Sequence, residues 1–90
     1  MKRIHLIISG DVVGVGFRTW IKVAAKKLEL TGWVKNRDDD TVELVAEGKE
    51  ENLKTMIELC HKGPSVAWVE HIEEIWEEYQ NEFDIFEVTR

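Results

Sequence analysis

The sequence has very little cysteine or proline: among its 90 residues there is one of each. The single cysteine, Cys60, excludes an internal disulfide, and no Cys-x-x-Cys pair is present for zinc or redox chemistry. Long hydrophobic runs are also missing. The longest uncharged run, residues 4–10, is far shorter than the ~20 residues of a membrane-spanning helix. These absences predict a cytoplasmic protein that makes no use of a membrane.

Positive charge is in the minority, with 12 Lys and Arg against 18 Asp and Glu and a net charge of −6. This balance argues against a protein that binds a nucleic-acid backbone. The charge is uneven, because residues 1–36 carry a net charge of +5 and the rest of the chain carries −11. A small anion is therefore attracted to the first part of the chain and repelled by the remainder.

Changes in the hydrophobic period along the chain predict the order of its secondary structure. Strands show dense or alternating apolar residues, helices an apolar stripe every three to four residues, and turns a run of Asp, Gly or Pro. The expected elements are a strand (2–9), a helix from Phe17 to residues 31–32, two strands (33–35 and 41–47) around a turn (36–40), a helix opened by Gly48 and ended after Lys62, a strand (67–76) and a short last strand (83–88). We therefore expect one domain, residues 1–90, in the order β-α-β-β-α-β plus a final short strand. Right-handed crossovers put both helices on one face of an antiparallel sheet, which is the ferredoxin-like α+β sandwich.

Residues 10–18 are the segment in which the sequence indicates chemistry. Glycines interrupt the strand there, and because no proline is present each residue can offer a backbone N–H. The helix that begins at Phe17 adds unpaired N–H groups and a positive dipole end, and Arg18 adds a planar fork of donors that matches phosphate oxygens. The residues expected to cradle a small dianion are Val13, Gly14, Val15, Gly16, Phe17 and Arg18. From these residues alone, a glycine-rich turn whose arginine faces solvent is an equally good interpretation.

Two nucleotide-binding loops are excluded by inspection of the same segment. A Walker A loop ends in Gly-Lys-Ser/Thr, whereas here Gly16 is followed by Phe17 and Arg18. The dinucleotide fingerprint needs a further glycine three positions after Gly16, where Thr19 stands.

Other side chains that could carry chemistry are interpreted as structural. Three consecutive aspartates, residues 38–40, cannot all face one cation, so we expect a solvated turn. The three histidines lack metal-ligand spacing, and Cys60 falls in the apolar stripe of the second helix. We expect all four tryptophans to pack in the core and on the sheet rather than to stack on RNA; they are Trp20, Trp33, Trp68 and Trp76.

Two motifs of this sequence resemble the signatures of the acylphosphatase family, in the right order and over essentially the whole chain. The first family signature is a glycine- and valine-rich loop that ends in an aromatic residue and an arginine; it is matched by Gly10, Val12, Gly14, Val15, Phe17 and Arg18. The second begins glycine-aromatic-valine-basic-asparagine; it is matched by residues 32–36, Val42 and Gly48. Two positions depart from the pattern. Val13 stands where the family usually has glutamine, and Asp40 stands where it usually has a glycine of the hairpin turn.

The resemblance implies a hydrolase that cleaves the carboxyl-phosphate bond of a small-molecule acyl phosphate, with no metal or cofactor, as a monomer. In this interpretation Arg18 binds the phosphoryl group and Asn36 positions the attacking water. Without the resemblance, the favoured role of Asn36 is that of a turn residue. The changes at Val13 and Asp40 leave a second hypothesis open, namely a non-catalytic module that binds a phosphate or carboxyl-phosphate group for regulation.

Overall fold

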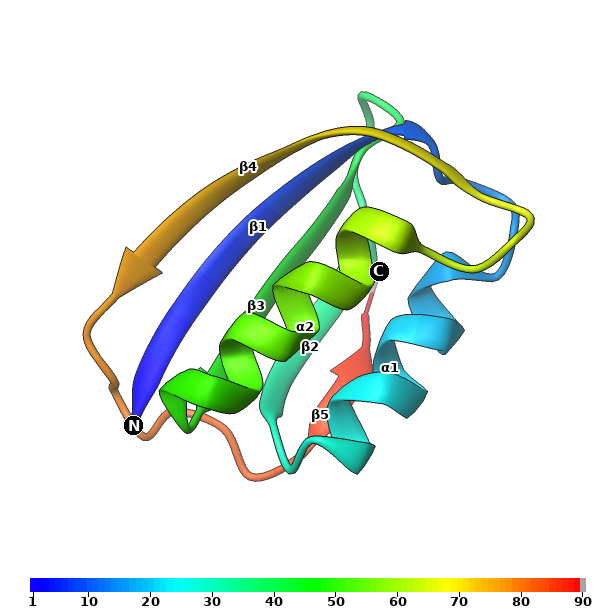
Figure 1. Ribbon diagram of the computed structural model, residues 1–90. Coiled ribbons are helices and arrows are strands. Elements are labelled where there is room, and N and C mark those ends of the chain that lie inside the picture. The colour runs from blue at the N-terminus through cyan, green and yellow to red at the C-terminus, as the bar shows by residue number, and fades with distance from the viewer. Residues whose placement is uncertain (90) are drawn as a thin grey trace.

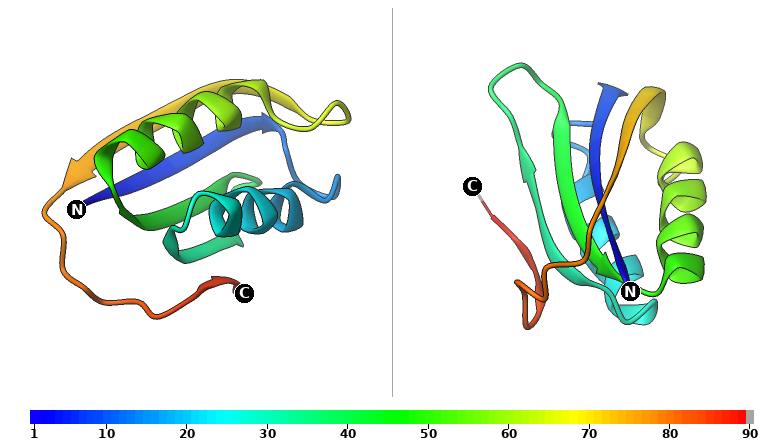
Figure 2. Two further views of the ribbon diagram at one scale, coloured as in Figure 1. Left: turned by 60° about the horizontal axis from the view of Figure 1, so that its bottom comes forward. Right: turned by 90° about the vertical axis from the view of Figure 1, so that its left-hand side faces the viewer.

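The computed structural model describes residues 1–89 and consists of one sheet with two helices on one of its faces (Figures 1 and 2). The elements in chain order are β1 (Lys2–Asp11), α1 (Phe17–Lys27), β2 (Thr31–Asn36), β3 (Val42–Gly48), α2 (Glu50–Lys62), β4 (Trp68–Glu77) and β5 (Phe86–Val88). The strand order is β4-β1-β3-β2-β5. The right-hand view of Figure 2 shows that the other face of the sheet has no helix. The ferredoxin-like α+β architecture expected from the sequence is confirmed.

The hydrophobic core lies between the sheet and the two helices. Along β1, buried residues alternate with more exposed ones, as a strand covered on one face requires. The helices contribute the stripes that their periodicity predicted: Phe17, Ile21 and Ala25 from α1, and Leu53, Met56, Ile57 and Cys60 from α2. Burial raises the pKa of the Cys60 thiol to about 12, so that the reactive thiolate is scarce at neutral pH.

Each helix has one boundary that differs from the one expected. α1 ends at Lys27, several residues early, because Glu29 adopts a left-handed φ of 56° and the Leu30 N–H turns back to donate to the Ala25 carbonyl. Gly48 ends β3 instead of opening α2, which begins at Glu50.

The last strand is shorter than expected, and it runs parallel to its neighbour instead of antiparallel. β5 covers only Phe86–Val88 and pairs parallel with β2, whereas every other pair in the sheet is antiparallel. The reason is topological: β4 and β5 lie at opposite edges, about 19 Å apart over four strand spacings. Residues 78–85, which we call the strap, are used to cross that width and cannot join the sheet (Figure 1).

The prediction that all four tryptophans are packed is wrong for Trp68, which is 69% exposed. Trp68 and Ile72 have the even spacing of residues on one face, but the pairing of β4 with β1 shifts between Ser9 and Gly10. This bulge places Trp68 opposite the exposed Asp11, on the face of the sheet without helices. Trp20 and Trp33 are half-buried, as expected, and Trp76 at the end of β4 is 37% exposed.

The strap is fastened to the sheet by Glu47, a side chain that is only 1% exposed. Its two carboxylate oxygens accept hydrogen bonds from the backbone N–H of Gln80, at 2.8 Å, and of Glu82, at 3.0 Å. Because Glu47 lies on β3 and the strap leads into β5, these bonds fix how the chain approaches the far edge of the sheet.

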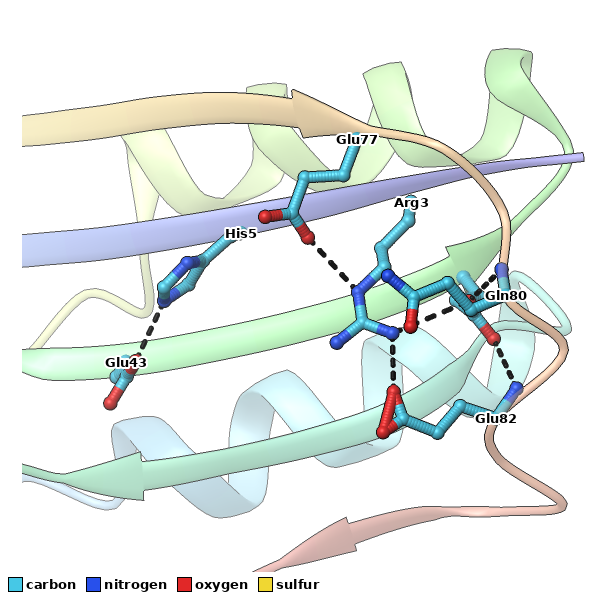
Figure 3. A network of polar contacts seen from close by, with 7 residues as sticks. Arg3, His5, Glu43, Glu77, Gln80 and Glu82 are labelled. Atoms are coloured by element: carbon cyan, nitrogen blue, oxygen red, sulfur yellow. Dashed lines mark hydrogen bonds and ion pairs between the residues drawn. The ribbon is translucent and has the colours of Figure 1, made fainter.

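Arg3 supplies the positive charge beside this buried carboxylate (Figure 3). Its Nη1 lies 3.6 Å from Glu47 Oε2 and also binds Glu82, and its Nε lies 3.0 Å from Glu77 Oε1. Burial alone would lower the pKa of Arg3, but the hydrogen bond to Glu82 and the surrounding carboxylates raise it above its usual value. The guanidinium therefore stays charged beside the buried Glu47 carboxylate.

Replacing Glu47 with alanine should lower the free energy of unfolding by ~3 kcal/mol, because the change leaves two strap N–H groups without their acceptor and removes one of the three carboxylates around the Arg3 guanidinium. Urea denaturation measures the loss. The matched control is Glu73→Ala, an exposed glutamate on β4, which should change stability by no more than ~0.5 kcal/mol. Equal losses in the two variants would contradict this role of Glu47.

Candidate active site

The end of the sheet at which β1 finishes also holds the start of α1 and the end of β2. β1 and β2 run in the same direction because each pairs antiparallel with β3. α1 connects them and runs back along the sheet, so that its first turn lies at the end where β1 stops (Figure 1). The loop at residues 12–16, the first turn of α1 and Asn36 are therefore brought to one end of the molecule.

The pairing register fixes the face on which the Asn36 side chain lies. Val42 of β3 pairs with Ile8 on one side and with Asn36 on the other. Paired residues share a face of the sheet, and both Ile8 and Val42 are 0% exposed beneath the helices. Asn36 thus faces the helix layer, where its Oδ1 is buried and has no hydrogen-bond partner among residues 1–89. Such a buried acceptor without a partner is unusual, which makes Asn36 a candidate for a functional role.

Gly10 is the point at which the chain leaves β1 for the loop. It lies at the bulge, with φ of 129°, and a Cβ placed there would be 2.2 Å from the carbonyl oxygen of Trp68. No side chain fits at that distance, so glycine is needed for β1 to stay paired with β4 while the loop turns away.

Gly14 and Gly16 are needed for a different reason. Both have space for a Cβ but adopt left-handed φ values, 79° and 76°, that other residues reach only with strain. Gly16 is also the N-cap of α1. Val13 precedes Gly14, and Val15 lies between the two glycines. Both valine side chains pack against the core, which anchors the loop.

The loop and the helix start carry hydrogen-bond donors that the protein itself does not use. Within the described chain, the N–H groups of residues 13–18 have no protein acceptor. α1 has no side-chain cap and no acidic residue in its first turn, so nothing offsets the positive end of its dipole. Arg18 is half-buried and forms no ion pair with any of residues 1–89. Charge and geometry together suit a compact anion.

The other polar groups considered in the sequence do not form a metal centre in the described part of the chain. Residues 1–89 contain no group of three or more His, Cys, Asp or Glu side chains placed to hold a metal ion. His5 instead contacts Glu43, with 2.6 Å between Nε2 and Oε2, on the face without helices (Figure 3). None of the helices described is long and apolar enough to cross a membrane.

The three aspartates of the hairpin turn, treated as equivalent in the sequence, differ in the structure. Asp39 accepts two hydrogen bonds from Thr41, and Asp40 adopts a left-handed φ of 64°. Asp38 makes no side-chain hydrogen bond or ion pair with residues 1–89. The spacing Asp-x-Thr is a known signal for a side-chain-capped turn, and it could have singled out Asp39.

Comparison with known proteins agrees with this geometry. The family model described as Acylphosphatase matches residues 4–88. The chain belongs to the acylphosphatase family. An acylphosphatase of Salinibacter ruber is 42% identical over 89 residues, which cover 99% of this chain and 94% of the relative. Among solved structures, the acylphosphatase of Bacillus subtilis matches with a TM-score of 0.96 at 36% identity and covers 100% of both chains. That of Coxiella burnetii matches with a TM-score of 0.92 at 35% identity, over 98% of this chain and 92% of the other.

The two departures from the acylphosphatase signatures have visible structural consequences. At the first, the Val13 side chain packs against the core, so the loop keeps its anchor but lacks the amide that glutamine would bring. At the second, Asp40 occupies the left-handed conformation that explains the usual glycine. Aspartate tolerates this conformation better than most residues, and the turn is retained.

The two kinds of glycine in the loop should respond differently to alanine. Gly14→Ala adds only the strain of a positive φ, ~1 kcal/mol. Gly10→Ala should lower the free energy of unfolding by roughly 3 kcal/mol, because the new Cβ also forces apart the end of β1 and the start of β4. Urea denaturation of the two variants gives the comparison, and a Gly10→Ala variant no less stable than Gly14→Ala would contradict the close approach.

Proposed function

We propose that the loop at residues 10–18 holds the phosphoryl group and that Asn36 positions the water in the reaction of this enzyme. The reaction is that of the acylphosphatase family, the hydrolysis of an acyl phosphate to a carboxylate and inorganic phosphate. The observation that carries the proposal is the set of unused donors at the start of α1: six backbone N–H groups and the Arg18 guanidinium, all at one end of the sheet. These donors suit the phosphoryl oxygens of the substrate.

Catalysis in this scheme depends on positioning and on charge. Phosphoryl transfer passes through a loose transition state whose charge is spread over the equatorial oxygens. Arg18 and the loop N–H groups stabilise that charge, and because they are already in place they need not reorganise as the reaction proceeds. In the proposal these groups take the part that a metal ion takes in other phosphoryl-transfer enzymes, so that no metal or cofactor is required.

The attacking water is held by Asn36. Its buried Oδ1, which has no protein partner, accepts a hydrogen bond from the water and turns the oxygen lone pair toward phosphorus. The water oxygen forms the new bond to phosphorus as the bond from phosphorus to the acyl oxygen breaks, and the electron pair leaves with the carboxylate. The water protons end on phosphate or in solvent. A carboxylate is a good leaving group, so a strong general acid is unnecessary.

The proposal also covers the partner, the location and the oligomeric state of the enzyme. The net charge of −6 supports a small-molecule partner rather than a nucleic acid, and the lone buried cysteine is compatible with the cytoplasm. We further propose a monomer. The comparisons provide no support for the alternative of a non-catalytic module, which would bind phosphate without turnover.

Removing the guanidinium should abolish most of the activity. We expect Arg18→Ala to lower kcat/KM for benzoyl phosphate by at least ~10²-fold, the scale for losing one preorganised charge-stabilising donor. Arg18→Lys, which keeps the charge but loses the fork, should recover only part of the loss. Lys22→Ala, one turn further along α1, is the matched control and should stay near the parent activity. Near-native hydrolysis by Arg18→Ala would refute the assignment.

Removing the Asn36 amide should separate turnover from binding. We expect Asn36→Ala to lower kcat by ~10²-fold, because the water is no longer held in line. The inhibition constant of inorganic phosphate, which binds at the loop, should remain within about 2-fold. Steady-state kinetics with phosphate as competitive inhibitor measures both quantities. If activity falls only in proportion to a loss of folded protein, Asn36 is a turn residue and not part of the reaction.

A further inference from the structure

The hairpin turn between β2 and β3 is held by one side chain. Asp39 Oδ1 accepts a hydrogen bond from the Thr41 hydroxyl at 2.6 Å and another from the Thr41 backbone N–H at 3.2 Å. Arg37 adds a longer contact, with 3.8 Å between Nη2 and the second carboxylate oxygen, Oδ2. Asp39 therefore contacts the residue that precedes β3 and, at the longer distance, the residue that follows β2.

This turn begins at the residue next to Asn36. The Arg37 N–H donates to the Thr41 carbonyl at 2.8 Å, and the Asp40 N–H donates to the Arg37 carbonyl at 3.2 Å. Asn36, the last residue of β2, pairs with Val42 directly below. The Arg37–Thr41 backbone bond thus closes the ladder whose final pair contains Asn36, and the Asp39–Thr41 contact lies within the turn just beyond it.

The Asn36 side chain depends on this backbone for its position. It forms no side-chain hydrogen bond with residues 1–89, and its Oδ1 has no partner. The turn itself contains a strained position, because Asp40 holds a positive φ where glycine would be unstrained. Without the bonds of Asp39, that strain favours opening of the turn beside Asn36.

We propose that Asp39 is a positioning residue for hydrolysis: by capping the turn through Thr41, it holds the Asn36 amide where the attacking water binds. This inference rests on the proposed role of Asn36. It assigns a function to a side chain that does not touch the substrate and that is absent from both family signatures. The hydrogen bond from the Thr41 hydroxyl also lowers the pKa of Asp39, so that the accepting carboxylate form persists further into the acid range.

The test compares variants that remove the acceptor with one that keeps it. Asp39→Ala should lower kcat for benzoyl phosphate by about 10-fold, below the ~10²-fold cost of a full 1 Å displacement, and leave phosphate inhibition unchanged. Asp39→Asn keeps an oxygen acceptor without the charge and should retain at least half of kcat. Thr41→Val removes only the hydroxyl, and its kcat should lie between those of Asp39→Ala and Asp39→Asn. Asp38→Ala is the matched control, because it removes an equal charge one residue away and breaks no side-chain hydrogen bond within residues 1–89.

A double-mutant cycle separates positioning from a general structural effect. If Asp39 acts through Asn36, Asp39→Ala should cost no more than about 2-fold in kcat when Asn36 is already alanine. A full 10-fold loss in that background, or an equal loss in Asp38→Ala, would overturn the inference. If Asn36→Ala itself leaves kcat unchanged, the proposed function fails; if it lowers kcat while Asp39→Ala does not, only the present inference fails.

Discussion

The pairing of β3 with two strands at once is the constraint on which the rest of this structure depends. It makes β1 and β2 parallel without hydrogen-bonding them to each other, and it sets Ile8, Val42 and Asn36 in one row. A shift of one residue in either pairing would turn Asn36 to the face without helices, away from α1. The buried faces of β1 and β3 resist such a shift, so the register that builds the core also orients the candidate site.

In the proposed function, the start of α1 gives up local stability in order to bind the phosphoryl group. A helix usually satisfies its first N–H groups with a polar N-cap and favours acidic residues in its first turn. Here the N-cap is Gly16, and the basic Arg18 occupies the first turn. The basic residue is unfavourable for an isolated helix, and glycine leaves the first N–H groups without a side-chain acceptor; both choices are favourable for a helix that binds a dianion. Such local disagreement with folding rules is typical of a functional position.

Most of the fold was predictable because it depends on short-range patterns in the sequence. The errors arose where contacts between residues far apart in the sequence determine the structure. The period of the apolar residues predicted both helices and the order of the strands, and the Gly10–Arg18 segment marked the loop. Trp68 was misplaced because the bulge leaves an extra residue, Glu70, unpaired in β4 opposite the Ser9–Gly10 step, and the spacing of the apolar residues does not reveal it. The last strand was predicted too long because β4 and β5 lie at opposite edges of the sheet, so that residues up to 85 are needed to cross it. Likewise, the orphaned oxygen of Asn36 is a property of the assembled core that no local motif encodes.

The fastening of the strap lies far from the end of the sheet where the reaction is proposed to occur. Arg3 and Glu47 pair near the start of β1, five residues before the row of Ile8, a span of about 17 Å. The contacts that hold the strap therefore lie at one end of the strands, and the proposed site lies at the other. A substitution at this fastening should therefore change the stability of the fold without a direct effect on the residues of the proposed site.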